Sequence, residues 1–525
     1  MGPGYAQGDG ARGGRVGPGE LALLASVFVV AACGLVYELC AGALASYLLG
    51  DSVLQFSTVI GTYLFAMGLG SWASRHVQTR LATMFVRVEL IVGLVGGLMP
   101  AALFAAHATL PAASMLSFKV LLYGLVTVVG IGVGLEIPIV LRLLDRHLKG
   151  RDSLSTLVSQ VLTFDYLGSL VVSVAFPLLL VPHLGIVRSG IFFGLFNTLV
   201  AIWSMWLFRA DIPGWRWLAA QCGVIFALLV AAMAAGDLLT TWSEDRFYGP
   251  GVVLHEDTPY QRIVVTSQSG TLRLFLNGNL QFNSKDEYRY HEALVHPAMA
   301  GYGAPRRVLV LGGGDGLAIR EILKYPSVEQ VTQIELDPRM TRLFTQDPAL
   351  SALNAHSLTS PKVHVVNADA FAWLEQHDDQ YDVIVVDFPD PSNYALGKLY
   401  STSFYELVDL HLAASGYAVV QTTSPLVARH SFWTVATTLE TVGLHVVPYH
   451  VHVPSFGEWG FIIASHRPWV MPRTLPAGLR FLTLPGMQAL LDFPTDMSRV
   501  PAEPNRLSNQ TLVRTFEEEW GKVHE

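Results

Sequence analysis

The first 240 residues alternate between long apolar stretches and short polar connections. A helix needs about 20 apolar residues to cross a bilayer. Seven stretches have roughly that length or more, at 21–48, 53–73, 84–106, 118–141, 157–181, 186–208 and 216–239. This pattern predicts a polytopic α-helical membrane domain of about seven helices over residues 21–240. Residues 1–20 are glycine-rich and lack the small-residue cleavage site of a signal peptide, so we expect a disordered tail before a retained helix.

After the last apolar stretch the hydrophobic period shortens. Residues 251–283 alternate apolar and polar positions around Ser-Gly at 269–270 and Asn-Gly at 277–278. Alternation interrupted by such dipeptides is typical of β-hairpins. We therefore expect a small β-hairpin domain over residues 245–300.

A third pattern follows, in which strands rich in β-branched residues alternate with helical stretches from 305 to about 466. This alternation predicts an α/β, doubly wound, Rossmann-like sheet over residues 301–470. Residues 471–525 form a C-terminal extension punctuated by prolines. The pattern gives no role for this extension.

A glycine run follows a buried strand in Val308-Leu-Val-Leu-Gly-Gly-Gly-Asp-Gly316. Glycines let the backbone turn tightly from strand into helix, as nucleoside-binding loops require. Asp315 would repel the carboxylate of S-adenosylmethionine, but could hold the ammonium of its decarboxylated form by a charge-assisted hydrogen bond. The run therefore favours an adenosyl nucleoside that lacks the carboxylate.

The next three predicted strands end in acidic residues. Glu335 follows the first glycine by roughly 20 residues, where nucleotide-binding units place the acceptor for ribose hydroxyls. The two later strands end in Asp369 and in the pair Asp387 and Asp390. Because open parallel sheets gather their strand ends at one edge, we expect these carboxylates in one crevice.

With these motifs the chain resembles the spermidine synthases, or polyamine aminopropyltransferases, over roughly residues 245–465. The motifs that carry the resemblance are Gly312-Gly-Gly-Asp-Gly316 with Arg320-Glu321, Ile334-Glu-Leu-Asp337, Asp369-Ala370, Asp387-Phe-Pro-Asp390-Pro391, Leu276-Asn-Gly-Asn-Leu-Gln281 and Asp286-Glu-Tyr-Arg-Tyr290-His291-Glu292. The resemblance implies a sheet of the class I methyltransferase type. It also implies transfer of the aminopropyl group of decarboxylated S-adenosylmethionine, a co-substrate, to putrescine or a related amine. The products would be spermidine and methylthioadenosine, and no cofactor would be permanently bound.

The resemblance also implies roles for individual residues. Nucleoside contacts are implied for Gln261, Glu335, Asp369 and Ala370, beside Gly312 and Gly314 of the loop. Polyamine contacts are implied for Tyr290, His291, Asp315, Asp390 and Gln421. Asp387 matches the catalytic proton acceptor. The loop 392–398 departs from the family's Gly-Pro with an acidic residue, which leaves the amine acceptor open.

The expected chemistry follows from charge. An amine with a pKa near 10.4 is mostly protonated at neutral pH and must lose a proton before it attacks the carbon next to a sulfonium. Asp387 would take this proton, and the neighbouring carboxylates would attract a diammonium ion. No cysteine lies in the second half, and no Cys/His set has the spacing of zinc ligands, so we expect no metal.

Each site residue also has a purely structural interpretation. Asp369 could serve only as a helix cap, His291 could be a buried structural histidine, and Asp337 could only start the next helix, with Pro338 in its first turn. Asp387 and Asp390 resist such an interpretation. Two carboxylates at a sheet edge are costly without a bound cation, and Lys398 is the nearest basic residue in sequence.

Composition supports a membrane protein with a cationic ligand. Of 525 residues, 51% are hydrophobic and only 14% charged, and the mean hydropathy of +0.40 is too high for an ordinary soluble enzyme. We expect a multi-pass protein of the cell membrane and a homo-oligomer. The net charge of −8 argues against nucleic acid as a partner. The three cysteines lie in predicted spans and say nothing of the redox compartment.

Within the predicted spans, the spacings Gly93-Leu-Val-Gly-Gly97 and Gly130-Ile-Gly-Val-Gly134 favour close helix packing. Ionisable residues also fall in or near the spans, namely Glu38, Glu89, Glu136 and Asp165. Ionisable groups at membrane depth are functional candidates because burying them is expensive. They could instead lie near an interface or pair with Arg87, Arg142 or His107.

Loop charges conflict with the expected supply of substrate. Three loops are basic, at 75–87, 142–151 and 209–216, and should be cytoplasmic. With seven spans this places the C-terminal half outside, although decarboxylated S-adenosylmethionine is expected in the cytosol. Either a span is miscounted, or the charge rule fails here, or the enzyme uses exported substrate.

Two other functions remain open from the sequence. An S-adenosylmethionine-dependent methyltransferase would use the same type of sheet, but Asp315 disfavours its carboxylated cofactor. A non-catalytic membrane protein that senses or transports polyamines would need the binding carboxylates. The presence of Asp387 together with Asp390 argues against this non-catalytic alternative.

Overall fold

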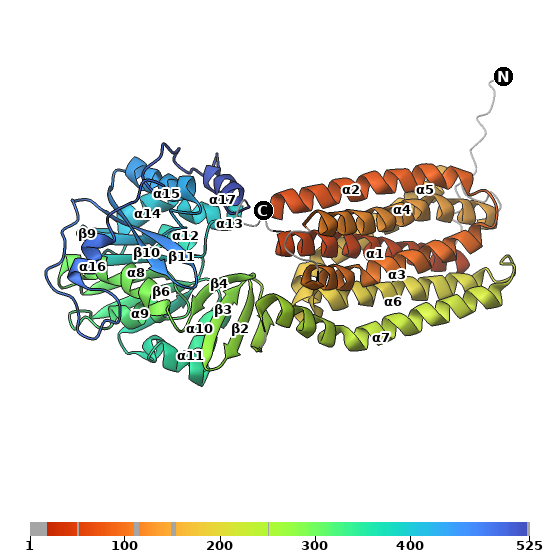
Figure 1. The fold of residues 1–525 in the computed structure, drawn as a ribbon. Coiled ribbons are helices and arrows are strands. Elements are labelled where there is room, and N and C mark those ends of the chain that lie inside the picture. The colour runs from red at the N-terminus through yellow and green to blue at the C-terminus, as the bar shows by residue number, and fades with distance from the viewer. Residues whose placement is uncertain (1–17, 50–51, 110–114, 149–153, 250, 522–525) are drawn as a thin grey trace, which may run out of the picture. The chain divides into compact units, whose positions relative to one another are not determined.

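A computed structural model describes residues 18–49, 52–109, 115–148, 154–249 and 251–521. The chain divides into two compact units, one that ends at Ser243 and one that runs from Glu244 to the C-terminus (Figure 1). The first unit is helical, and the second combines strands and helices. Each unit has its own hydrophobic core.

Long apolar helices make up the first unit. They are α1 (Pro18–Leu49), α2 (Ser52–Ala73), α3 (Leu81–Thr109), α4 (Met115–Leu148), α5 (Leu154–Ala175), α6 (Val181–Leu207) and α7 (Trp215–Tyr248), with a 3-10 turn η1 (Ser74–His76) and a π-helical turn η3 (Phe176–Leu180). Among the described residues, six helical stretches are long and apolar enough to cross a membrane. Large apolar side chains such as Leu64, Phe65 and Leu170 are exposed on these helices, as suits a lipid-facing surface.

The number of crossings depends on the stretch Ser155–Leu207, which is 53 residues long. A straight helix of this length would measure about 80 Å, against about 30 Å of hydrocarbon core. At Gly185 the backbone is not helical, with φ +71° and ψ 169°. The break supports two separate spans here, and seven crossings stay a prediction.

Glycines bring the helices of this unit close together, as the small-residue spacings predict. A Cβ atom on Gly93 would lie 2.9 Å from the Cβ of Asn197, so α3 and α6 meet at this point. A Cβ atom on Gly134 would lie 2.1 Å from the carbonyl oxygen of Met67, which places α4 directly against α2. A larger residue at either glycine would force its two helices apart.

The second unit begins with the predicted β-hairpins. Four antiparallel strands follow one another in a sheet, β1 (Val252–Asp257), β2 (Arg262–Gln268), β3 (Thr271–Leu276) and β4 (Asn279–Asn283). Both predicted turns are confirmed. Ser269 and Gly270 have φ of +50° and +76°, and Asn277 and Gly278 have +49° and +85°. Two successive positive φ values are what a tight hairpin turn of type I′ requires.

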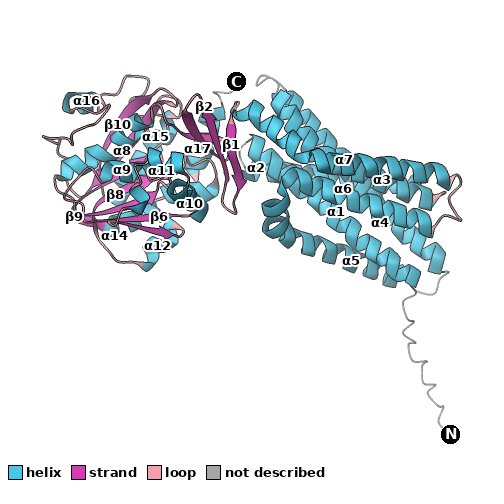
Figure 2. Cartoon of the chain, turned by 90° about the horizontal axis from the view of Figure 1, so that it is seen from below, coloured by secondary structure: helices cyan, strands magenta, loops and turns pink. Residues whose placement is uncertain are grey.

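A seven-stranded sheet follows, in the order β10-β11-β9-β8-β5-β6-β7. Figure 2 shows its strands in magenta among the cyan helices of this unit. Its strands are β5 (Arg307–Gly312), β6 (Gln330–Glu335), β7 (Val363–Asn367), β8 (Tyr381–Asp387), β9 (Leu412–Gln421), β10 (His445–Val453) and β11 (Gly457–Ser465). The first five are parallel, whereas β10 and β11 run antiparallel to their neighbours.

Helices cover both faces of this sheet, as expected for a doubly wound fold. The helical elements are α8 (Glu287–Tyr302), α9 (Leu317–Ile322), α10 (Pro338–Gln346), α11 (Pro348–Leu353), η4 (Ser357–Thr359), α12 (Ala370–Gln376), α13 (Tyr394–Gly397), η5 (Lys398–Tyr400), α14 (Thr402–His411) and α15 (Arg429–Val442). Val308 and Val310 of β5 share one core with α8, α9 and α10. Leu309 and Leu311 share the opposite core with α12, α14 and α15. The alternation along β5 therefore fixes which helices lie on each face.

The C-terminal extension packs onto this sheet unit. It contains α16 (Leu484–Ala489) and α17 (Thr511–Gly521). The buried carboxylate of Glu292 on α8 accepts hydrogen bonds from three successive backbone N–H groups, at residues 480–482, over 2.7–2.9 Å. Asn505 donates to the carbonyl oxygens of Gly397 and Tyr400 at 3.0 and 3.1 Å. These hydrogen bonds from the extension hold residues 397–400, in the segment after β8, in place.

Candidate functional site

The candidate site lies where the strand order of the large sheet reverses. From β5 the chain proceeds to β6 and β7 on one side, and then to β8 and β9 on the other. Gly312 and Asp387 are paired at the carboxyl ends of β5 and β8. Ligands of open α/β sheets bind in the crevice at such a switch point. The predicted convergence of strand ends is confirmed here.

Glycine is required in the loop after β5 because other groups approach its backbone. Gly312 has φ +85°, and a Cβ atom there would lie 2.3 Å from the carbonyl oxygen of Asp387. A Cβ atom on Gly314 would lie 2.7 Å from Oε2 of Glu335. The two glycines thus let the ends of three strands close around one space.

On the β6 side, Glu335 and Gln261 are held near each other through Asp337. The buried Asp337 caps α10 and accepts hydrogen bonds from Thr258 Oγ1 at 2.8 Å and Gln261 Nε2 at 3.1 Å. Its backbone N–H donates to Glu335 Oε1 at 2.9 Å. Burial raises the pKa of Glu335 to about 7. The helix-capping role predicted for Asp337 is confirmed, but its link to Gln261 was not predicted.

Asp369 caps α12, which begins at Ala370. Its Oδ1 accepts from the backbone N–H of Phe371 at 2.8 Å, and its Oδ2 pairs with Lys398 Nζ at 2.8 Å. Burial would raise the pKa of Asp369, but the Lys398 ammonium holds it below its ordinary value. Lys398 therefore forms its ion pair with Asp369 and does not neutralise the carboxylates at the end of β8.

Three carboxylates follow β5 and β8: Asp315 lies in the loop after β5, Asp387 ends β8, and Asp390 lies in the loop after β8. Tyr290 on α8 donates a hydrogen bond to Asp387 Oδ1 at 2.7 Å. Burial raises the pKa of Asp387 to about 6 and that of Asp390 to about 7, and it also raises the pKa of Asp315. Oδ1 of Asp390 is buried and has no hydrogen-bond partner among the described residues. A bound positive charge would stabilise the ionised form of each of these carboxylates.

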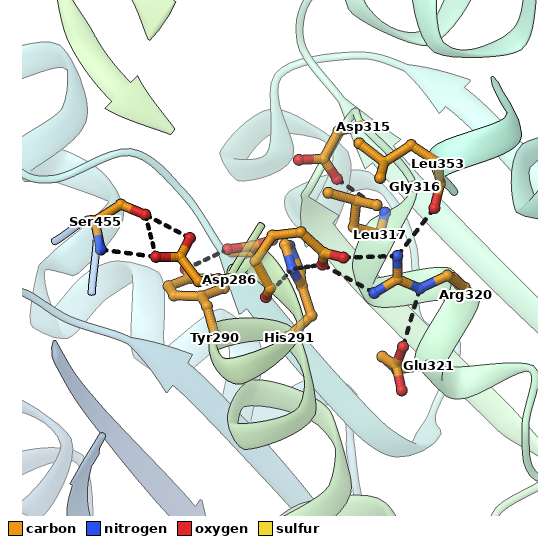
Figure 3. A network of polar contacts seen from close by, with 12 residues as sticks. Asp286, Tyr290, His291, Asp315, Gly316, Leu317, Arg320, Glu321, Leu353 and Ser455 are labelled. Carbon is orange, nitrogen blue, oxygen red and sulfur yellow. Dashed lines mark hydrogen bonds and ion pairs between the residues drawn. The ribbon is translucent and has the colours of Figure 1, made fainter. Parts of the chain in front are cut away.

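Only one oxygen of the Asp315 carboxylate is hydrogen-bonded to a described residue. Its Oδ1 accepts a hydrogen bond from the backbone N–H of Leu317 at 2.9 Å, at the start of α9 (Figure 3). Asn354 donates to the backbone carbonyl oxygen of Asp315 at 2.8 Å. The second carboxylate oxygen has no hydrogen bond to a described residue. This oxygen is the one that a bound ammonium could use.

His291 is held by a buried ion network behind the site (Figure 3). Its Nδ1 contacts Glu287 Oε2 at 2.9 Å, and Arg320 donates to both oxygens of Glu287 at 2.9 and 3.0 Å. Burial alone would lower the pKa of His291, but Glu287 raises it to about 9. His291 is therefore a cation at neutral pH, and its positive charge opposes the rise in the pKa of Asp387 and Asp315.

The network continues away from the site. Arg320 Nε donates to Glu321 at 3.0 Å, and His296 Nε2 lies 2.9 Å from the other oxygen of Glu321. Despite its burial, Glu321 has its pKa lowered to about 2 by His296, Lys324 and Arg320. Glu287 and Arg320 occur in the sequence motifs, but 33 residues separate them, and no sequence pattern indicates that they pair.

The side-chain amide of Gln421, at the end of β9, is hydrogen-bonded to the loop after β8. Its Nε2 donates to the carbonyl oxygen of Phe388 and, at 2.9 Å, to the hydroxyl of Tyr400, while its Oε1 accepts from Trp459 at 3.0 Å. These bonds position Asp390, which lies two residues beyond Phe388. Nothing in the sequence pattern singled out Tyr400.

A metal centre finds no support in the described part of the chain. No group of three or more His, Cys, Asp or Glu side chains there is arranged to hold a metal ion.

The chain is similar over nearly its whole length to known polyamine aminopropyltransferases. The family described as "Spermine/spermidine synthase domain" matches residues 287–471. A polyamine aminopropyltransferase 2 of Ralstonia nicotianae is 53% identical over 520 residues, covering 96% of this chain and 99% of that protein. A polyamine aminopropyltransferase of Leptospira interrogans is 47% identical over 504 residues, with coverage of 96% and 99%. A solved spermidine synthase in complex with the transition state analogue AdoDATO is 24% identical, with a TM-score of 0.43, and covers 46% of this chain and 86% of that one. Both sequence relatives extend across the apolar half.

Proposed function

The chain belongs to the polyamine aminopropyltransferase family, and from this premise we propose how its residues perform the transfer. The enzyme moves the aminopropyl group of decarboxylated S-adenosylmethionine to putrescine or a related amine, giving spermidine and methylthioadenosine. The observation that carries the proposed site is the buried Oδ1 of Asp390, which has no hydrogen-bond partner among the described residues. Among the described residues, no lysine or arginine forms an ion pair with Asp315, Asp387 or Asp390.

In the proposed reaction the acceptor amine enters as an ammonium ion. Asp390 holds one end of the amine, and Asp387 takes the proton of the nitrogen that reacts. Tyr290 keeps Asp387 in place through its 2.7 Å hydrogen bond. The freed nitrogen forms a bond to the carbon next to the sulfonium, and the breaking S–C bond leaves its electron pair on sulfur. The neutral thioether then departs as methylthioadenosine.

The other side of the crevice would hold the nucleoside. Glu335 is proposed to accept the ribose hydroxyls, with Gln261 kept near it through Asp337. Asp369 and Ala370 would contact the base where α12 begins. Gly312 and Gly314 let the nucleoside approach the backbone, and His291 and Gln421 would complete the amine side.

Selection of the decarboxylated cofactor is the first expected result. The free oxygen of Asp315 attracts an ammonium and repels a carboxylate, and like charges brought together cost several kcal/mol. Calorimetry on the full-length protein should therefore show at least about tenfold tighter binding of the decarboxylated form than of S-adenosylmethionine. In the Asp315→Asn variant this preference should shrink. Equal affinities in the wild type would favour the methyltransferase alternative.

The pH profile should have an acid limb that depends on the amine. Asp390, with its pKa raised to about 7, and Asp387, with its pKa raised to about 6, must both be ionised to work. Since kcat/KM reports the free enzyme, it should fall as the pH drops through 7 and more steeply below 6. A bound ammonium favours the ionised carboxylates, so the limb of kcat should lie at lower pH. If the acid limbs of kcat and kcat/KM lay at the same pH, the assignment of these limbs to Asp387 and Asp390 would be contradicted.

Substituting Glu287 by glutamine should move the acid limb of kcat/KM to higher pH. Without the Glu287 carboxylate, burial lowers the pKa of His291, and Asp387 loses a neighbouring cation that favours its ionised form. The substitution also leaves Arg320 with an unbalanced charge, so thermal stability should fall.

The matched control for this variant is Glu321→Gln. It disturbs Arg320 from the opposite side but leaves the contact between Glu287 and His291. It should lower stability without moving the limb. If Glu287→Gln likewise left the limb in place, Glu287 would have only a structural role.

We propose that the enzyme is a multi-pass protein of the cell membrane, supported by six helical stretches of sufficient length and apolarity in the described chain. Substrate supply favours a cytosolic catalytic unit, and the basic loops favour the opposite side. Protease digestion of intact spheroplasts decides between them, because only an external catalytic unit would be cut. A homo-oligomer stays a prediction.

A further inference from the structure

A layer of polar side chains lies inside the helical unit, where α1, α3 and α6 meet. Cys33 on α1 donates to the carbonyl oxygen of Phe193 on α6 at 3.5 Å. A Cβ atom on Gly96 of α3 would lie 2.7 Å from the ring of Tyr37 on α1. Close contacts of this kind enclose the polar groups between the helices. Glu89, Asn197 and Tyr37 are all 0% exposed.

The layer contains hydrogen-bond acceptors that lack donors. Asn197 Nδ2 donates to Glu89 Oε2 at 3.0 Å, so the amide faces the carboxylate. Glu89 Oε1 and Asn197 Oδ1 are buried without a partner among the described residues. The same holds for Oε1 of Glu136 on α4, which is 2% exposed, and for the hydroxyl of Tyr37. Glu136 is also close enough to Glu89 to interact with it electrostatically.

The buried polar atoms without a partner among the described residues indicate which kind of ligand could bind between these helices. A buried carboxylate without a counter-charge is strongly unfavourable, and within the described chain neither Glu89 nor Glu136 has an ion-pair partner. Three of the four free groups are acceptor oxygens, so a partner with N–H or O–H donors would satisfy them, and a positive charge on that partner would balance the ionised carboxylates. An alkylammonium supplies three donors and one charge. A metal ion is disfavoured, since no metal-type cluster of His, Cys, Asp or Glu occurs in the described ranges.

We propose that the interior of the helical unit binds an amine, with one ammonium group held by Glu89, Glu136 and Asn197. The choice of a polyamine among alkylammonium ions rests on the proposed function of the catalytic unit. The helical unit is then a polyamine-binding element and more than an anchor.

The test is equilibrium dialysis of radiolabelled putrescine against the full-length protein in lipid nanodiscs. Two sites per chain are expected, one in each unit. The variant with Glu89→Gln and Glu136→Gln should weaken one site by on the order of 30-fold or more, the effect of losing one partner of a buried charge pair. It should release methylthioadenosine at the wild-type rate. Asp145→Asn, an exposed carboxylate on α4, is the control and should keep both sites.

A measurement on the unchanged protein covers the case in which the double variant does not fold. A hydrophobic carbodiimide should modify Glu89 or Glu136, and putrescine should slow this reaction while equal ionic strength of sodium chloride should not. A single site per chain, two sites in the double variant, or protection by sodium alone would each overturn the proposal. If the membrane site binds putrescine but no methylthioadenosine is ever released, the proposed function fails and this inference stands.

Discussion

Replacing Asp387 by asparagine is expected to lower kcat by 10²–10⁴-fold, the usual cost of losing a general base. The amide has nearly the shape of the carboxylate and can still accept the hydrogen bond from Tyr290, so the fold should persist. What is lost is the ability to take a proton from the reacting ammonium. The measurement is the rate of methylthioadenosine release at saturating amine and decarboxylated cofactor, with nucleoside affinity followed by calorimetry.

A suitable control for this variant is Asp379→Asn. Asp379 lies just before β8 and pairs with Arg307 at the amino end of the sheet. It carries the same charge but is remote from the crevice, so its variant should turn over normally. Wild-type release of methylthioadenosine by Asp387→Asn would remove Asp387 from the mechanism.

Replacing Asp390 by asparagine should act mainly on the amine. Its buried Oδ1 has no hydrogen-bond partner within the described chain, and an ammonium would donate a hydrogen bond to it. Loss of one member of a buried charge pair costs about 2–5 kcal/mol, so KM for the amine should rise at least about 30-fold. The KM for the decarboxylated cofactor should change little. Saturation curves with each substrate varied in turn give both constants.

Asp369→Asn provides the complementary comparison. Asp369 caps α12 on the nucleoside side and pairs with Lys398. Its variant should raise KM for the cofactor and leave KM for the amine near that of the wild type. If both variants raised the same constant, the division of the crevice into an amine side and a nucleoside side would be wrong.

Local sequence patterns predicted much of the catalytic unit because local chemistry determines them. The two Gly-containing turns of the hairpins need positive φ values, which few residues other than Gly and Asn adopt easily. The acidic ends of β6 and β8 could be expected in one crevice, since parallel strands in a doubly wound sheet end at one edge. Gly312 could be interpreted in the same way, because its loop must turn beside another strand end.

Tertiary contacts between distant segments could not be predicted in this way. Glu287 and Arg320 lie on different helices, and only the packing of α8 against α9 brings them together. The C-terminal extension shows no periodic pattern, yet Asn505 holds the loop that carries Tyr400. Such contacts depend on the position of whole elements, which hydrophobic periodicity does not specify.

The helical unit shows the same division between local and distant information. Glycine spacings predicted its close helix contacts, and the structure has them at Gly93 and Gly134. The sequence also identified Glu89 and Glu136 as ionisable residues at membrane depth. It suggested arginine or histidine partners, whereas Glu89 is bonded to Asn197, 108 residues further along the chain.

The most direct test of the account is product analysis with the purified full-length enzyme. It is incubated with decarboxylated S-adenosylmethionine and putrescine, and the products are identified by mass spectrometry, with Asp387→Asn as the inactive control. We expect spermidine and methylthioadenosine in equal amounts from the wild type and neither from the variant. Formation of a methylated amine and S-adenosylhomocysteine from S-adenosylmethionine, with no spermidine from the decarboxylated cofactor, would contradict the account.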